Sequence, residues 1–498
     1  PFLTLVSMPR LWPALANYVA RATASRRLWY STVSRIPAPP GALLRVSIPA
    51  DCKPLNVVIN TTSPLDADAG GAESATFDVP DGCAVERDGG DVVVTRQGNH
   101  GTAKEINITI PERYVGVHLA THAGSVIFKG SIKEAAVSVV APSGSIVAQK
   151  GTSIQGSSVV LAAGELPGID FSAGTLAATP LRLEATSGGS VFAKKVVSGD
   201  AIVGATKGPG TVHINTMFAH TAVVATDSGT LTIKAGRYGA SLAGGVDGGP
   251  LRTEGEDGGG GDGEGGCGGK GDKMFEGSVR EFAVPSAKSA DAYAAHKWEA
   301  YSLRGSPPPL DAEGGLLAIS KGGGIHVDGI EGAAAAVRAG SPGLLGFAFP
   351  SFRRADVRVS ATTECTRLTA MNRGDGEVYL SIPPPADLEE DAGGNHSRAG
   401  RGVPVESAVS EWKLRIVAAR GVRYTSENVA NALNWCGAPH APLTSLPYGP
   451  RWVAQRQSVR KDTTYKVSGS SNDVELKVEA ERGTLIIGEH TWKPNWSA

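Results

Sequence analysis

The feature that most constrains this chain is a repeat of roughly 20 residues that runs from Val117 to about Tyr238. Each of six successive segments contains a short β-forming run, a turn of small residues and a second short run. A glycine recurs at the same phase of the six turns, at Gly124, Gly144, Gly164, Gly189, Gly210 and Gly229. Runs such as 125–128 and 230–233 are too short to bury an apolar face alone, whereas stacked repeats bury a continuous one.

The repeat therefore predicts an all-β fold, specifically a single elongated β-solenoid in which rungs of about 20 residues stack on one another. An antiparallel sandwich is the alternative, because its strands also recur every 8 to 12 residues or so. The constant phase of the glycines favours the solenoid. In that fold we expect the inward side chains to include Val126, Phe128, Ile146 and Leu231, and the outward ones to include Lys129 and Gln149.

Composition divides the chain into four predicted parts: a leader and hinge at 1–40, a cap with the repeats at 41–243, an insertion at 244–312, and a continuation with a C-terminal cap at 313–498. Residues 1–110 lack the repeat phase, as expected of a cap that covers unpaired backbone at the end of a stack. The insertion begins with a glycine- and acid-rich tract at 244–273, which we predict to be disordered. One short helix is expected within 281–303. Strand patterns return at 316–320, 325–327, 355–360, 377–382, 412–417, 464–467, 473–479 and 484–487.

The first 50 residues contain six arginines and no aspartate or glutamate. From Met8 the segment has the basic, amphipathic pattern of a mitochondrial transit peptide, with processing expected near Tyr30 and Ser31. Plastid import is the alternative address, and a disordered basic arm remains a further interpretation. A secretory signal is disfavoured because Arg21 and the pair at 26–27 interrupt the apolar core that it requires.

The overall composition argues against several classes of protein. The formal net charge of −1 lacks the basic surplus of a nucleic-acid binder. The five cysteines include no C-x-x-C pair, so neither a disulfide framework nor a zinc site is indicated. The sequence contains no run of 18 apolar residues, so it predicts no transmembrane segment.

Several local motifs suggest chemistry but fail on their details. The tract 265–270 resembles a phosphate-binding loop, yet Glu264 and Gly271 replace the glycine and the hydroxyl residue that the motif requires. The tract 239–243 lacks the last glycine of a nucleophile elbow. His118 and His122 share a face only if their strand runs unbroken, and a turn follows at once. We therefore predict no catalytic, metal-binding or cofactor-binding residue.

Lyases built on β-solenoids require acidic and basic residues clustered on one sheet, so the acids of the repeats matter. These acids do not recur at one phase, which leaves no carboxylate pair for acid–base work. They are Glu134, Glu165, Asp170, Glu184, Asp200 and Asp227.

Tryptophan and arginine gather near the C-terminus and have two interpretations. Large aromatic side chains next to arginine often anchor protein interfaces, but they also plug the open end of a stack. The candidate interface residues are Trp412, Trp435, Arg451, Trp452 and Arg456.

Four features together resemble the auto-transporter-adhesin-like head domain family, in particular its mitochondrial members in animals. They are the first strand with its cysteine at 44–52, the Gly-Ser turns of the repeats, the segment 324–329, and the closing segment 483–487 followed by Trp492. The resemblance implies a β-solenoid and a mitochondrial address, and it carries over no catalytic residue. The insertion at about 244–310 and the loop near Asn395 depart from the family pattern.

These observations predict a non-catalytic mitochondrial scaffold or protein-interaction subunit that needs no cofactor and has an unidentified protein partner. The alternative is an adhesin-like or polysaccharide-binding protein. A lyase-type solenoid enzyme is the third hypothesis.

Overall fold

The computed structural model describes residues 32–48, 52–63, 74–79, 83–89, 91–96, 104–164, 166–239, 290–301, 314–340, 355–386, 409–433, 458–468 and 473–489. The predicted leader with Tyr30 and Ser31, and the tract 244–273, lie outside these residues. Within them the protein is all-β, as the sequence predicts. Two helices accompany the strands, α3 (Ala290–Ala300) and α5 (Glu427–Ala432).

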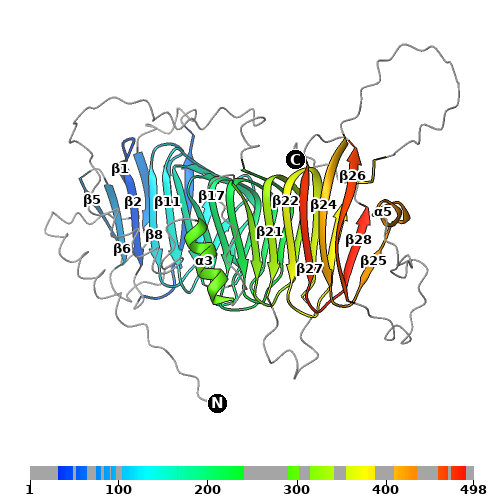
Figure 1. The fold of residues 1–498 in the computed structure, drawn as a ribbon. Coiled ribbons are helices and arrows are strands. Elements are labelled where there is room, and N and C mark those ends of the chain that lie inside the picture. The colour runs from blue at the N-terminus through cyan, green and yellow to red at the C-terminus, as the bar shows by residue number, and fades with distance from the viewer. Residues whose placement is uncertain are drawn as a thin grey trace, which may run out of the picture.

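Most strands pair in parallel and form three long ladders that run side by side along the molecule (Figure 1). The first ladder contains, in spatial order, β6 (Asp91–Arg96), β2 (Leu43–Ile48), β8 (Gly116–Thr121), β11 (Ala136–Ala141), β14 (Ser158–Ala163), β16 (Leu181–Ala185), β17 (Ser190–Ala205), β18 (Val212–Thr226), β20 (Gly315–Ser320), β21 (Ile325–Ala339), β22 (Val357–Asn372), β27 (Val474–Ala480) and β24 (Val409–Ala418).

The other two ladders share the long strands with the first, because these strands bend and continue from one ladder into the next. The second ladder contains β7 (Glu105–Pro111), β3 (Asn56–Thr62), β9 (Val126–Lys129), β12 (Ile146–Ala148), β15 (Gly168–Ala178), β17, β18, β19 (Leu231–Tyr238), β21, β22, β23 (Val378–Ile382), β28 (Leu485–Glu489) and β25 (Val422–Tyr424). The third contains β10 (Ser131–Lys133), β13 (Ser153–Gly156), β15, β17, β18, β19, β21 and β22.

Successive repeats pair in register and in parallel, which excludes the antiparallel sandwich for residues 116–239. Val117 pairs with Val137 in the first ladder, and Val126 pairs with Ile146 in the second. Equivalent residues of neighbouring repeats therefore stack directly on one another, as the constant phase of the sequence repeat predicts.

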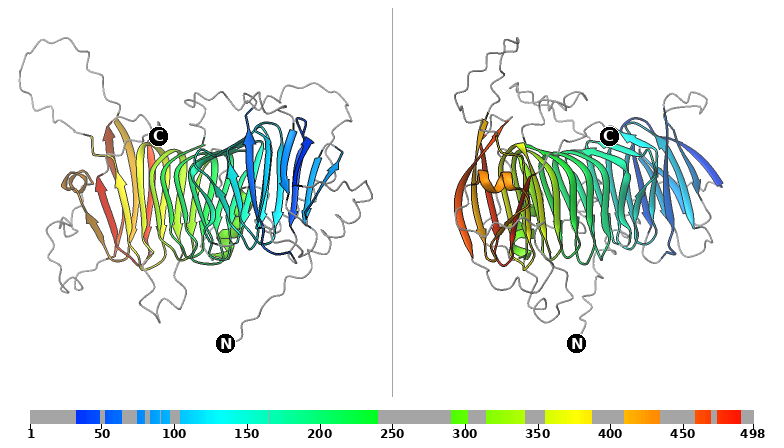
Figure 2. Two further views of the ribbon diagram at one scale, coloured as in Figure 1. Left: turned by 180° about the vertical axis from the view of Figure 1, so that it is seen from behind. Right: turned by 90° about the vertical axis from the view of Figure 1, so that its right-hand side faces the viewer.

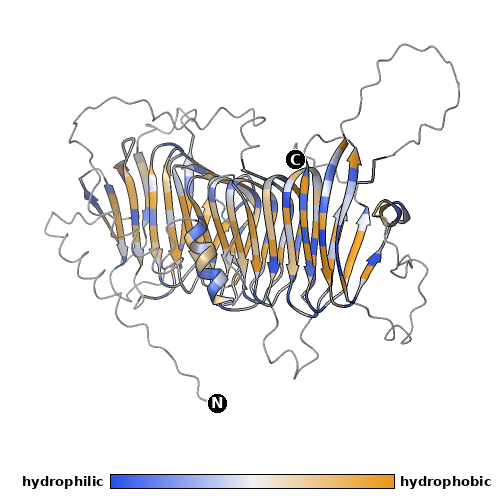
Figure 3. Ribbon diagram, viewed as in Figure 1, coloured by the Kyte–Doolittle hydropathy of each residue, from blue (hydrophilic) through white to orange (hydrophobic). Residues whose placement is uncertain are grey.

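The apolar side chains of the ladders meet in one continuous core. The four residues predicted to point inward, Val126, Phe128, Ile146 and Leu231, are all buried there. Gln149 is exposed and Lys129 is half-buried, so the predicted orientation of these strands is confirmed. Figure 3 shows apolar residues recurring across the strands along the whole stack.

The recurrent glycines are explained by the close approach of successive turns. A Cβ atom on Gly210 would lie 1.9 Å from the carbonyl oxygen of Gly189, and one on Gly229 would lie 1.9 Å from that of Gly210. Gly323 continues the column, 1.8 Å from the carbonyl oxygen of Gly229. Only glycine fits where one backbone turn rests on the next.

At both ends the order of strands in space differs from their order in the chain (Figure 2). At the N-terminal end, β2 and β3 contact β8 and β9, while the later strands β6 and β7 pair on the far side. Strands β2, β3, β6 and β7 therefore belong to the parallel ladders. The sequence pattern predicts strands here that lead into the stack, but not their spatial order. Antiparallel strands complete this end: β1 (Thr32–Pro37), β4 (Ser74–Val79) and β5 (Cys83–Asp88).

The C-terminal end has the corresponding arrangement. The last strands, β27 and β28, insert between β22 and β23 on one side and β24 and β25 on the other. The outer edge of β24 is covered by the antiparallel strand β26 (Val459–Ser468). The sequence predicts these strands, with the exception of β25, but not this insertion.

Candidate functional site

Of the five predicted interface residues, the structure describes only Trp412. Its side chain is 0 % exposed and its ring packs against Tyr465, with ring centroids 6.4 Å apart. This position favours the interpretation that Trp412 fills the C-terminal end of the core. Trp435, Arg451, Trp452 and Arg456 lie outside the described residues.

Of the motifs rejected from the sequence, the tract 265–270 and residues 240–243 lie outside the described residues, and only the histidine pair can be compared with the structure. Strand β8 ends at Thr121, so His122 follows the strand that carries His118. Among the described residues, no group of three or more His, Cys, Asp or Glu side chains could hold a metal ion. Within the same part of the chain, no helix is both long and apolar enough to span a membrane.

Helix α3 lies on the outer side of the first ladder (Figure 1). There it covers apolar side chains of the strands. Helix α3 contacts β17, β18 and β20. The outward residues of the ladder beneath and around it form a second apolar cluster, consisting of Val140, Ala162, Ile202, Val223, Ala225, Leu317, Ile319 and Ala336. The helix contributes Ala290, Tyr293, Ala294 and Trp298, and Tyr301 follows directly after its last residue.

A sequence signal for this cover exists. Strands with one solvated face alternate between apolar and polar residues, whereas strands covered on both faces read as continuous apolar runs. Nearly continuous apolar runs occur in the first ladder at 158–163, 221–225 and 315–319. They indicate that another element must pack on the outside of the stack.

Two charged side chains are buried within this otherwise apolar contact. Glu184 on β16 is 6 % exposed, and Lys297 on α3 is 8 % exposed. Glu184 Oε1 accepts a hydrogen bond of 2.8 Å from Thr206 Oγ1, while its Oε2 is buried without a hydrogen-bond partner among the described residues. We call Glu184, Thr206, Asp227, Tyr293, Lys297 and Tyr301 the α3 charge cluster.

Asp227 is the second carboxylate of the cluster and has partners on both oxygens. The hydroxyl of Tyr301 donates to its Oδ1 at 2.8 Å, and the backbone N–H of Lys207 donates to its Oδ2 at 2.6 Å. The last turn of the helix is thereby fixed to the turn that follows β18. Asp227 therefore holds the C-terminal end of α3 in place.

The aromatic residues of α3 surround the cluster. Lys297 Nζ lies 5.2 Å from the ring centroid of Tyr293 and 5.8 Å from that of Tyr301, within the range of cation–π attraction. Tyr293 enters the sheet surface at Gly204, where a Cβ atom would lie 2.5 Å from its hydroxyl oxygen. Gly204 is the register partner of Glu184, so the tyrosine hydroxyl lies against the strand next to the one that carries the carboxylate.

Burial shifts the acid–base properties of the cluster. It raises the pKa of Glu184 to about 7, although the nearby Lys297 charge and the hydrogen bond from Thr206 act in the opposite direction. Burial lowers the pKa of Lys297, against the attraction of Glu184 and Asp227. Burial also raises the pKa of both tyrosines, so they stay neutral. The cluster can thus exchange a proton near neutral pH.

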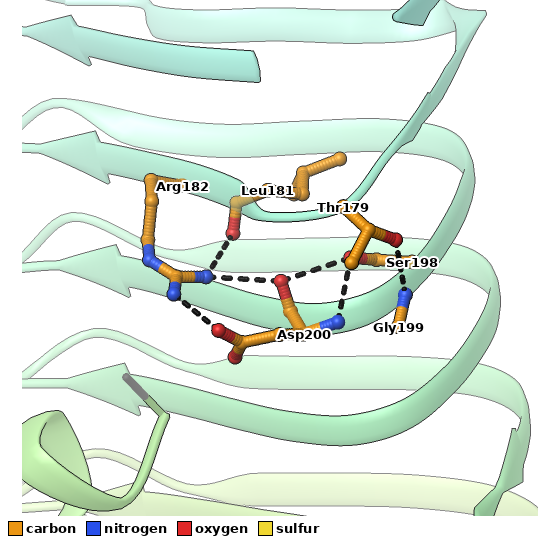
Figure 4. A network of polar contacts seen from close by, with 6 residues as sticks. All are labelled: Thr179, Leu181, Arg182, Ser198, Gly199 and Asp200. Carbon is orange, nitrogen blue, oxygen red and sulfur yellow. Dashed lines mark hydrogen bonds and ion pairs between the residues drawn. The ribbon is translucent and has the colours of Figure 1, made fainter. Parts of the chain in front are cut away.

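A second polar network on the same side of the molecule is structural (Figure 4). Arg182 forms an ion pair with Asp200 and donates to the backbone oxygens of Leu181 at 3.0 Å and Asp200 at 2.9 Å. Ser198 Oγ donates to the carbonyl oxygen of Asp200 at 2.9 Å and accepts from its N–H at 3.1 Å. These bonds fix the bend where β17 passes from the third ladder to the first.

A shallow polar hollow of about 460 Å³ lies near the C-terminal end of the first ladder. Its charged side chains alternate in sign across paired strands, with Arg367 and Lys413 as register partners of Glu475. Arg367 Nε lies 3.8 Å from Glu475 Oε2, and both side chains are exposed. An exposed pair of this kind contributes little to stability or recognition.

Comparison with known proteins identifies no relative, since no family model, no curated protein and no solved structure matches the chain.

Proposed function

We propose that the chain forms a single elongated β-solenoid that acts as a non-catalytic scaffold or protein-interaction subunit in mitochondria. The in-register parallel pairing of successive repeats and the continuous apolar core support the solenoid. A stack of this kind presents long, regular outer faces, which repeat proteins use as binding surfaces.

The observation that carries the interaction role is the α3 contact itself. The outer face of the first ladder binds one face of α3 through apolar side chains and encloses the polar side chains of Glu184 and Lys297. A face with this composition is complementary to segments that carry aromatic residues and a lysine at one-turn spacing, as Tyr293 and Lys297 on α3 and Tyr301 directly after it do. The scaffold proposal extends this mode of binding to protein partners.

The mitochondrial address rests on the arginine-rich, acid-free leader and on the family resemblance. Expression of the tagged chain in cultured cells, followed by organelle fractionation and chemical crosslinking, tests both parts of the proposal. We expect the chain in the mitochondrial fraction, with a stoichiometric protein partner crosslinked to exposed lysines such as Lys194 and Lys234. A chain exported from the cell, or crosslinks without any stoichiometric partner, would contradict it.

Polysaccharide binding is the second candidate, and one specific observation favours it. A column of aromatic and basic side chains, interrupted only by Thr232, runs along the outside of the second ladder. Each residue is in register with the next: Phe192, His213, Thr232, His326, Arg358 and Tyr379. Against it, neighbouring members stack on each other, since the Arg358 guanidinium lies 4.6 Å from the ring centroid of Tyr379. Their faces are therefore partly occupied.

Retention on immobilised polysaccharides distinguishes the two candidates. The scaffold proposal predicts that the wild-type chain and an Arg358→Ala, Tyr379→Ala double variant both pass unretained. Retention of the wild type that is lost in the double variant, and kept in a Lys234→Ala control, would establish the second candidate instead.

A further inference from the structure

The attachment of α3 to the stack combines two kinds of contact with different responses to pH. Ala294 and Trp298 make apolar contacts that do not titrate, and the Arg338 guanidinium also lies 4.4 Å from the ring centroid of Trp298. The contacts around Glu184 do titrate. No strand pairing joins the helix to the sheet, so its position depends on these side-chain contacts. A change of charge in the cluster therefore acts directly on the docking of the helix.

The groups that face Glu184 come from every element packed around it. Arg182 lies on β16 together with Glu184 and forms an ion pair with Asp200. The turn after β17 supplies Thr206 and Lys207, and the turn after β18 supplies Asp227. Helix α3 supplies Lys297 and the neutral hydroxyls of Tyr293 and Tyr301. On the other side, β14 presents only the apolar Ala162, the register partner of Glu184.

The ionised form of Glu184 is poorly accommodated in this setting. Its Oε2 is buried without a hydrogen-bond partner among the described residues, and the buried hydroxyl of Tyr293 is in the same condition. An unpaired buried carboxylate oxygen costs more free energy than a neutral carboxyl group does. Release of the helix would return the carboxylate to water and remove that cost.

We propose that docking of α3 on the first ladder is linked to a proton: protonation of Glu184 holds the helix on the sheet, and ionisation loosens it. The inference goes beyond the scaffold function and does not depend on it. Loosening of α3 at higher pH would expose the apolar outer face of the first ladder.

The sign of the effect follows from the direction of the pKa shift. The pKa of Glu184 is raised from 4.5 to about 7 when the helix is docked, so the added stability is complete below about 4.5 and is lost as the pH rises through about 7. For these two pKa values, docking is favoured roughly 70-fold more at pH 5 than at pH 8. The lowered pKa of Lys297 acts in the opposite direction, since it favours docking as the pH rises.

Hydrogen exchange of the 290–301 peptide in the full-length chain, expressed as protection relative to the intrinsic rate at each pH, tests this proposal. We expect protection to increase tens of fold from pH 8 to pH 5 in the wild type. In Glu184→Gln the increase should disappear or reverse. Peptides from β14 should show constant protection and so confirm that the stack stays folded.

Three matched variants make the test specific. Glu299→Gln and His296→Gln change titratable groups on the exposed side of α3 and should keep the wild-type response. Lys297→Met removes the charge that lowers the pKa of Glu184, so the midpoint of the response should move to higher pH. The proposal is overturned by a pH-independent wild type, by a response that is lost in His296→Gln, or by a midpoint that does not rise in Lys297→Met.

Discussion

Truncation of one inward side chain tests the assignment of inside and outside in the repeats. Ile146 lies on β12, is fully buried, and stands in register between Val126 and Ile169 of the neighbouring strands. Replacing it with alanine removes three carbon groups, which at about 0.8 kcal/mol each accounts for roughly 2.4 kcal/mol. The unfilled cavity adds to this loss, so we expect a total of about 3 to 4 kcal/mol.

The matched variants lie on the same or neighbouring strands. Val126→Ala removes only two carbon groups and should cost about 2 kcal/mol. Lys129→Ala and Gln149→Ala change outward side chains and should stay within about 0.5 kcal/mol. Urea unfolding measures the differences, and hydrogen exchange should locate the damage in β9, β12 and β15, because each repeat contacts only its neighbours. If Lys129→Ala were as destabilising as Ile146→Ala, the predicted orientation of the strands would be wrong.

Further predictions concern the turns and the C-terminal end. Gly229→Ala should destabilise the chain by about 1 to 3 kcal/mol in thermal melts, because its Cβ would collide with Gly210. Gly322→Ala should be nearly neutral, because its Cβ would lie 3.7 Å from the nearest atom. Equal melting temperatures for the two variants would refute the stacked arrangement of the turns. Trp412→Ala should cost about 3 to 5 kcal/mol in the isolated chain, whereas an interface residue would leave its stability unchanged. Cysteine pairs at Arg367 with Glu475, and at Glu475 with Lys413, should form disulfides on oxidation, but a pair at Arg367 with Lys413 should not, because those strands are separated by β27. A disulfide in the last pair alone would refute the insertion of β27.

The features of the fold that depend on local sequence could be predicted. The phase of the glycines reflects the contact of one turn with the next, as at Gly210 and Gly229. The alternation of residues around Val126 and Ile146 identifies which side chains of these strands point inward. The helix expected within 281–303 is present as α3. Each of these features is determined by a short stretch of sequence.

The spatial order of the end strands could not be predicted in the same way. Alternation specifies which face of a strand is buried, but any strand with the same pattern can be its neighbour. The pattern at 474–480 is therefore equally compatible with pairing outside β24 and with its actual position between β22 and β24. The choice depends on contacts between segments far apart in the chain.

The α3 charge cluster was only partly visible in the sequence. Glu184 and Asp227 are two of the six acids of the repeats, and nothing in the sequence distinguishes them from the other four. They come together because Lys297 and Tyr301 arrive from a helix beyond the end of the repeats. The continuous apolar runs of the first ladder were the one sequence signal for such a cover.

The central claim is that the chain forms one continuous stack on both sides of the segment 240–313. Thr232 on β19 and His326 on β21 test it most directly, because they are register partners on opposite sides of that segment. Neighbouring strands place paired Cα atoms about 4.8 Å apart, which suits a disulfide, whereas His213 is one strand further from His326, at roughly 9.6 Å. After mild oxidation, peptide mapping should find a disulfide in Thr232→Cys, His326→Cys and none in His213→Cys, His326→Cys. Absence of the first disulfide in the folded protein would mean that the two parts do not stack and that the single-solenoid account is wrong.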